Sequence, residues 1–421
     1  MRNIKSALIA LLLTSSLYAQ QRDSLDLKIG QMLLIGIPKA EIDQLVLEEV
    51  RAGKVGSILL FEKNIPKGTA SFTALKKIIW TYQRAATIPL IVAIDQEGGR
   101  VNRLKDKYGF ARSITAQDMG KAPTLDSVRF YSESTAATLA GLGFNVNFAP
   151  VVDLGVNKDN TVIYKVGRAF SANPDSVAMM AGEFITPHRR FGVITVLKHF
   201  PGHGSSQADT HYGVADVTKT WSAAELIPYQ KLIGANAADA VMSAHIVNKQ
   251  LDPSGLPGTL SKRVLDSLLR KQLGFDGVVF SDDMQMHAIT KQYGLEEAIR
   301  LSINAGIDIL CFSNNIQGSE ERTVNKVHAI MRSMVEKGQI SPARIDKSYR
   351  RILMLKARMN KLPEENLVRD LEASRNEAAA LKKSLEQSQA NLRAVQKADS
   401  VKAIQAVEES KSKKKKKKKS E

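Results

Sequence analysis

Histidine, lysine and aspartate side chains are concentrated in one short segment, which runs from Lys198 to His211 as KHFPGHGSSQADTH. Three of the seven histidines lie there, and Pro201 with its neighbouring glycines predicts a loop. Asp209 and His211 are two positions apart, so a turn between them would bring a carboxylate and an imidazole together. A carboxylate beside an imidazole orients the ring and raises its basicity, which suits general acid/base chemistry near neutral pH.

The same segment contains side chains of the types that bind zinc. These are His199, His203, Asp209 and His211. However, His199 and His203 stand on either side of Pro201 and Gly202, so they do not share one face of a helix. We therefore favour acid/base chemistry over a metal site for this segment.

A second segment, GVVFSDDM at 277–284, is an apolar run that ends in two adjacent carboxylates. A buried acid without a role costs free energy, which favours a functional role here. Asp282 has the chemistry of a nucleophile for covalent catalysis. Asp283 would point to the opposite side of a continuing strand, so we expect it to bond to backbone or to a neighbouring loop.

Eight short apolar segments lack strict polar alternation and are predicted to be parallel strands buried on both faces. They span 31–37, 57–61, 90–95, 145–150, 193–198, 240–246, 278–282 and 308–312. Amphipathic stretches between them, for example at 222–235 and 261–273, predict helices. This alternation predicts an α/β fold, a single (β/α)8 TIM barrel, with a doubly wound open sheet as the alternative.

Polar residues follow the predicted strands at their carboxyl ends, where a barrel collects its functional groups. They are Asp95, Asp153, Lys198, His199, His245, Asp282 and Asp283. The lone cysteine, Cys311, falls in the eighth strand and is predicted to pack in the core. One cysteine excludes an intramolecular disulfide and a cysteine-rich zinc site.

The two ends of the chain contribute much of the formal net charge of +17 but are not expected to belong to the barrel. Residues 1–19 have the layout of a signal peptide, because Arg2 and Lys5 precede an apolar run that ends in small and polar residues. We therefore expect export, with the protein periplasmic or secreted. The barrel is predicted over 24–360.

Residues 361–408 are predicted to form a helical extension, since they are rich in Ala, Leu, Glu and Lys. Lysines 413–419 are consecutive and repel one another, so 409–421 is predicted to be a disordered tail. The tail is either a solvated, non-specific segment or an attachment to an anionic membrane or cell-wall surface. Export makes nucleic acid an unsuitable partner.

Three motifs together resemble glycoside hydrolase family 3, in particular its bacterial β-N-acetylglucosaminidase branch, which acts on peptidoglycan fragments. They are DQEGGRVNR from Asp95, KHFPGHG followed by DTH, and FSDDM. The resemblance covers about residues 28–358. It implies a single (β/α)8 barrel that needs no metal or organic cofactor and takes a carbohydrate substrate.

The resemblance also implies roles for individual residues. Asp282 matches the nucleophile, His211 the general acid/base and Asp209 its partner in a dyad. The residues that match those holding an N-acetylglucosamine ring are Asp95, Arg103, Arg168, Lys198 and His199. The implied reaction is the exo-acting, retaining removal of terminal N-acetylglucosamine through a glycosyl ester on Asp282.

Three alternatives remain open. The protein could be another family 3 β-glycosidase, although such enzymes usually take their acid/base from a second domain. A histidine acid/base also leaves room for phosphate as the acceptor, which would make a phosphorylase. From a different class, a non-catalytic barrel could bind cell wall or membrane, but the presence of Asp209, His211 and Asp282 argues against it.

Overall fold

The computed structural model describes residues 25–68, 70–207, 213, 215–315, 323–359 and 387. The predicted signal peptide, the helical extension apart from Gln387, and the lysine tail lie outside these residues. The chain divides into two compact units, 1–360 and 361–421, and the barrel belongs to the first.

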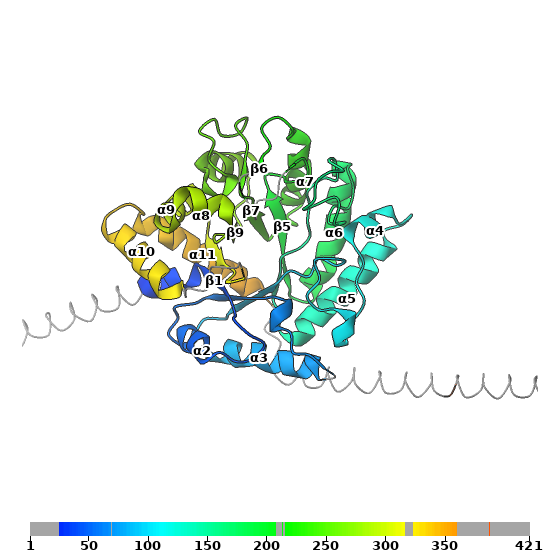
Figure 1. Cartoon of the computed structure of the whole chain (residues 1–421), viewed down its shortest axis with the longest axis horizontal. Helices are drawn as coiled ribbons and strands as arrows, with labels where there is room; N and C mark the ends of the chain where they lie inside the picture. The colour runs from blue at the N-terminus through cyan, green and yellow to red at the C-terminus, as the bar shows by residue number, and fades with distance from the viewer. Residues whose placement is uncertain are drawn as a thin grey trace, which may run out of the picture. The chain divides into compact units, whose positions relative to one another are not determined.

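Eight parallel strands close into a barrel, in the spatial order β1-β10-β9-β7-β5-β4-β3-β2 (Figure 1). They are β1 (Leu33–Gly36), β2 (Ser57–Leu60), β3 (Ile91–Ile94), β4 (Val146–Asn147), β5 (Ile194–Phe200), β7 (Ala240–Ser243), β9 (Val278–Asp283) and β10 (Ile309–Phe312). Pairing of β1 with β10, with Leu33 opposite Leu310, closes the ring. The predicted TIM barrel is therefore confirmed, and the open sheet is excluded.

Each of the eight predicted strands is present, although the observed bounds differ from the predicted ones, and in two strands the structure shows why. The strand predicted at 240–246 leaves the barrel after Ser243, and Ile246–Val247 forms β8, which pairs instead with β6 (Ala215–Asp216). The strand predicted at 145–150 has only two residues in β4, because asparagine side chains replace part of the ladder. Asn145 accepts from Val92 N at 2.8 Å and donates to Leu90 O at 2.9 Å.

Helices surround the strands (Figure 1). The longer ones are α2 (Gln44–Arg51), α3 (Ser71–Ala85), α5 (Asp126–Leu142), α6 (Pro174–Arg190), α7 (Ile227–Gly234), the π-type helix η5 (Arg263–Gln272), α9 (Leu295–Ala305), α10 (Val324–Glu336) and α11 (Pro342–Arg358). Shorter ones are η1 (Glu62–Asn64), η2 (Asp106–Tyr108), α4 (Ala116–Lys121), η3 (Ala223–Leu226), η4 (Gly258–Leu260) and α8 (His287–Tyr293). The helix predicted at 222–235 is present as η3 followed by α7, and that predicted at 261–273 as η5.

Burial and capping explain where these helices form. The apolar face of α3 is buried through Leu75, Ile78, Ile79 and Tyr82, at the spacing of an amphipathic helix. Asn173 caps α6, its side chain accepting from Ser176 N at 3.0 Å, and such a cap stabilises a helix by about 1 kcal/mol. Within the described part of the chain, we find no helix long and apolar enough to cross a membrane.

Strand β5 shows how the barrel positions chemistry. All seven of its residues are buried, and the apolar ones pack in the core. Two polar residues, Lys198 and His199, nevertheless lie near its carboxyl end. A buried lysine needs a counter-charge, so the partners of Lys198 define the site.

Candidate active site

A cavity of ≈ 280 Å³ lies at the carboxyl ends of the barrel strands. Its charged and polar lining comes from Asp95, Glu97, Arg103, Arg168, Lys198, His199, His203, Asp282, Asp283, Ser313 and Asn315. The apolar lining includes Phe61, Phe148, Met242 and Met286. The cavity is therefore a polar site set into an apolar barrel end.

Lys198 is the cation at the centre of this lining and is only 1% exposed. Its Nζ lies 2.8 Å from Asp95 Oδ1 and 2.6 Å from Glu97 Oε1. Arg103 adds a second cation, with Nη2 at 3.3 Å from Asp95 Oδ2. Burial alone would raise the pKa of Asp95, but the charges of Lys198 and Arg103 outweigh it and hold that pKa below its ordinary value.

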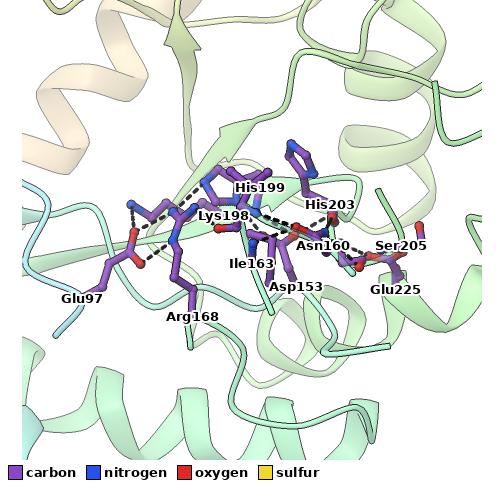
Figure 2. Close-up of polar contacts among 12 residues, drawn as sticks. Glu97, Asp153, Asn160, Ile163, Arg168, Lys198, His199, His203, Ser205 and Glu225 are labelled. Carbon is purple, nitrogen blue, oxygen red and sulfur yellow. Dashed lines mark hydrogen bonds and ion pairs between the residues drawn. The ribbon is translucent and has the colours of Figure 1, made fainter. Parts of the chain in front are cut away.

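Arg168 forms a bidentate ion pair with Glu97. Its Nε and Nη2 each lie 2.8 Å from one carboxylate oxygen (Figure 2). Burial opposes ionisation of Glu97, yet the charges of Arg168 and Lys198 lower its pKa to about 2. Glu97 therefore stays ionised and fixes both cations.

The guanidinium of Arg168 also determines the tautomer of a neutral His199 ring. Arg168 Nη2 lies 3.1 Å from His199 Nε2, and a guanidinium can only donate, so this nitrogen accepts. The proton of a neutral His199 ring must then sit on Nδ1, which lies 2.6 Å from Asp153 Oδ2. Arginine, histidine and aspartate form a single chain of hydrogen bonds (Figure 2), in which Arg168 and His199 line the cavity.

His203 is 3% exposed and borders the same cavity. Its ring centroid lies 5.9 Å from that of His199. Burial lowers the pKa of His203 to about 4, so the ring is neutral at pH 7. Within the described residues, neither of its ring nitrogens has a hydrogen-bond partner.

Asp282 and Asp283 end strand β9 with different surroundings. Both border the cavity, and Asp282 Oδ1 accepts from Asp283 N at 2.8 Å. Asp283 Oδ1 accepts from Ser313 N at 3.2 Å and from Gln285 N at 3.1 Å. The predicted bonding of Asp283 to neighbouring backbone is thereby confirmed, and burial raises the pKa of this carboxyl.

His245, predicted at the end of the sixth strand, supports this arrangement from outside the cavity. Its Nε2 lies 2.9 Å from the carbonyl oxygen of Asp283, and its Nδ1 lies 2.8 Å from Thr259 Oγ1. Cys311 is buried in β10 as predicted, and it also borders the cavity.

Six of the eight predicted site residues line the cavity together. They are Asp95, Arg103, Arg168, Lys198, His199 and Asp282. The other two, Asp209 and His211, lie outside the described residues. Among the residues that are described, no group of three or more His, Cys, Asp or Glu side chains could hold a metal ion.

No role in sugar binding or catalysis was expected from the sequence for Glu97, Asp153 or His203. A signal for Glu97 was available, because it lies two positions from Asp95 within the motif DQEGGRVNR, and the predicted site contained three cations. Asp153 stood after the fourth predicted strand, in the position where a barrel collects functional groups.

The fold and the site together define a class of protein. A parallel (β/α)8 barrel with paired acids and bases around a cavity at the carboxyl ends of its strands is the architecture of a barrel enzyme. The family model described as "Glycosyl hydrolase family 3 N terminal domain" matches residues 24–355. The chain belongs to glycosyl hydrolase family 3.

Named relatives support this placement. A β-hexosaminidase of Tolumonas auensis is 34% identical over 292 residues, which are 68% of this chain and 84% of that protein. A solved family 3 β-N-acetylglucosaminidase from a Paenibacillus species superposes with a TM-score of 0.73 at 32% identity, over 79% of this chain but only 62% of that one. A β-N-acetylhexosaminidase from Beutenbergia cavernae gives 0.71 at 29% identity, over 79% of this chain and 98% of that one.

Proposed function

We propose that the protein is an exo-acting, retaining β-N-acetylhexosaminidase that removes terminal N-acetylglucosamine from the non-reducing end. The observation that carries this proposal is the shared cavity of Asp282 with Asp95, Lys198 and Arg168, in a chain whose relatives are named β-hexosaminidases. Asp95 offers acceptors and the two cations offer donors, which is the mixture that sugar hydroxyls require.

The size of the cavity favours action at a chain end. At ≈ 280 Å³ it lies just below the range of about 300–1,000 Å³ that is usual for small-molecule sites. One sugar ring suits this volume better than a length of polysaccharide does.

In the proposed mechanism, Asp282 attacks the anomeric carbon while protonated His211 donates its proton to the leaving oxygen. The glycosidic bond breaks and a glycosyl ester of Asp282 forms. His211, held by Asp209, then takes a proton from water, which attacks the ester and releases the sugar with its original anomeric configuration. Because a neutral histidine base carries no negative charge, it does not repel the Asp282 carboxylate as a second acid would.

Peptidoglycan fragments are the proposed natural substrate. The resemblance to the peptidoglycan-acting branch supports this choice, and the predicted signal peptide would place the enzyme where wall fragments occur. The test compares release of N-acetylglucosamine from a muropeptide disaccharide with release from chitobiose. Equal or faster release from chitobiose would contradict a preference for wall fragments.

The activity itself is tested with an aryl N-acetyl-β-glucosaminide. We expect release of the chromophore by the natural chain and loss of release by Asp282→Asn. A 2-deoxy-2-fluoro or 5-fluoro glycosyl substrate should leave its sugar covalently attached to the peptide that contains Asp282, detected by mass spectrometry. An active enzyme that labels another residue would refute the assigned nucleophile, and acceleration by phosphate with release of sugar 1-phosphate would indicate a phosphorylase.

A further inference from the structure

A carboxylate outside the cavity holds the backbone that leads from the cavity lining toward the predicted acid/base pair. Glu225, in η3, is 1% exposed and does not line the cavity. Its Oε2 accepts from Gly204 N at 2.8 Å, and its Oε1 accepts from Ser205 N at 3.2 Å. Both oxygens are thus committed to consecutive backbone N–H groups.

Three buried side chains hold the segment 199–205 (Figure 2). Asp153 accepts from His199 N at 3.2 Å and from His203 N at 2.8 Å. Asn160 donates to the carbonyl oxygens of His203 and Gly204, at 2.9 and 3.1 Å. Asp153 therefore fixes the backbone at His199 and His203, whereas Glu225 alone among the three accepts from the last two N–H groups of the segment.

The contact between Glu225 and this backbone is direct. Gly202 has φ of +115°, and a Cβ placed there would lie 2.5 Å from Glu225 Cβ. Trp221 extends the contact, since its Nε1 donates to Pro201 O at 3.0 Å. The segment 199–205 packs against η3 and against Trp221, which precedes η3. A change at Glu225 therefore acts directly on the backbone of the segment, without an intervening side chain.

We propose that Glu225 is a positioning residue for turnover: its ionised carboxylate holds Gly204 and Ser205 in place, and protonation releases one of the two. A carboxyl group that gains a proton loses one acceptor and gains a donor, which repels the N–H it formerly accepted. This inference rests on the proposed glycosidase function, because it concerns the rate of that reaction.

The surroundings of Glu225 bring this protonation into the neutral range. Burial raises the pKa of Glu225 to about 7, and the negative charge of Asp153 adds to the rise, while the bonds from Gly204 and Ser205 oppose it. On α7, the buried hydroxyl of Tyr229 has a pKa well above 10 and stays neutral. His203 is neutral as well, so Asp153 is the charged neighbour that affects the pKa of Glu225.

The effect should appear in kcat more than in KM. His199, the nearest predicted sugar ligand, is held independently by Asp153 and Arg168. Glu225 holds the part of the chain between His199 and the predicted acid/base pair. If Glu225 no longer holds this part of the chain, the predicted acid/base pair should be displaced from the position that proton transfer requires, while the sugar should still bind.

The deciding experiment compares pH profiles of the natural chain and Glu225→Gln on the aryl N-acetyl-β-glucosaminide. The natural chain should lose kcat as the pH falls through about 7, with KM changed less than twofold. Glu225→Gln, which is neutral at every pH, should lack that limb and show a kcat about tenfold lower at pH 8, because small misplacements of reacting groups are costly in rate.

Asp252→Asn is the matched control. Asp252 is also a buried carboxylate that caps a loop, accepting from Ser254 N at 3.0 Å, but it does not line the cavity and its pKa lies below the ordinary value. This variant should retain the limb near pH 7. Glu225→Gln with an unaltered limb, in an active enzyme, would overturn the inference.

A readout independent of turnover separates this inference from the proposed function. Deuterium exchange at Gly204 and Ser205, corrected for intrinsic rates, should accelerate at least tenfold in Glu225→Ala and not in Asp252→Asn. Unchanged exchange overturns the positioning role even if no glycosidase activity is found. Conversely, faster exchange in a protein that is inactive on every aryl glycoside would support the role of Glu225 in holding Gly204 and Ser205, and it would refute the proposed glycosidase function.

Discussion

The two ends of the barrel both bury carboxylates among cations, but they use them differently. At the amino ends of the strands, Asp308 accepts from Arg270 Nη2 at 2.7 Å and from Ser348 Oγ at 2.6 Å, and Arg344 adds a further ion pair. Asp239 is covered in the same way by Arg189 and Arg358. At the carboxyl ends, Asp95 and Glu97 share Lys198 beside an open cavity.

The difference teaches what distinguishes a structural ion cluster from a functional one. Around Asp308, side chains of α11 and η5 bond to the residue that immediately precedes β10, and they tie the outer helices to the barrel. Around Lys198, the charged groups come from loops and strand ends and border a space large enough for a ligand. The same pairing of charges stabilises one end and prepares the other for binding.

The largest predicted effect belongs to the cavity end. Asp282→Asn should lower kcat by about 10⁴-fold, because removing a nucleophile abolishes the covalent route. The melting temperature should fall by little. Activity and thermal unfolding measured on the same preparation check this, and a loss of activity that merely follows unfolding would contradict the assignment.

The opposite behaviour is expected at the other end. Asp308→Asn leaves the guanidinium groups of its three partners, Arg270, Arg344 and Arg351, without a full counter-charge, which should lower the free energy of unfolding by about 3–5 kcal/mol. The kcat per folded molecule should be unchanged. Urea unfolding with active-site titration measures both quantities. A reduced kcat in the folded fraction would contradict a purely structural role for Asp308.

Glu97→Gln should give an intermediate result. The amide keeps the shape of Glu97 but loses the charge that holds Lys198 and Arg168, so kcat/KM should fall by about 10–100-fold. Glu49→Gln, on α2 away from the cavity lining, is a control with the same chemical change. If both variants retained full activity, the ion pairs of Glu97 would have no part in the site.

The smallest effect is a pH dependence at the amino end. Lys356 Nζ donates to Gln31 Oε1 at 2.5 Å and to Gly56 O at 2.9 Å, and burial lowers its pKa to about 7. Between pH 7 and 10 the unfolded chain binds a proton that the folded chain does not, so the contribution of Lys356 to stability is lost as the pH falls from 10 toward 7.

The melting temperature of the natural chain relative to Lys356→Met should accordingly rise by a few degrees from pH 7 to pH 10. Thermal scans across this range test the direction. Lys121→Met, at an exposed lysine, is the control and should show no such trend. A difference that falls with rising pH would show that Lys356 is charged in the fold.

The sequence was sufficient for the strands and for most of the charged residues of the cavity lining. Local pattern indicates the strands and the polar groups at their ends, whereas Arg103 and Arg168 were expected only from the family resemblance. Apolar runs ending in Asp95, Lys198 or Asp282 indicate buried strands that deliver polar groups to one end. The partners that set the charges are harder to predict. Glu225 meets Gly204 only because η3 packs on the loop after β5, and that contact depends on the closed barrel.

The pairing of β6 with β8 has a consequence for how a catalytic acid would be delivered. Asn157 donates to Ser206 O at 2.8 Å, and Ala215 pairs with Ile246, so the eight residues between Ser206 and Ala215 have both ends attached to the barrel. Asp209 and His211 belong to this stretch. In the proposed mechanism, the number of residues between these two attachments would set the effective concentration of His211 at the bound sugar.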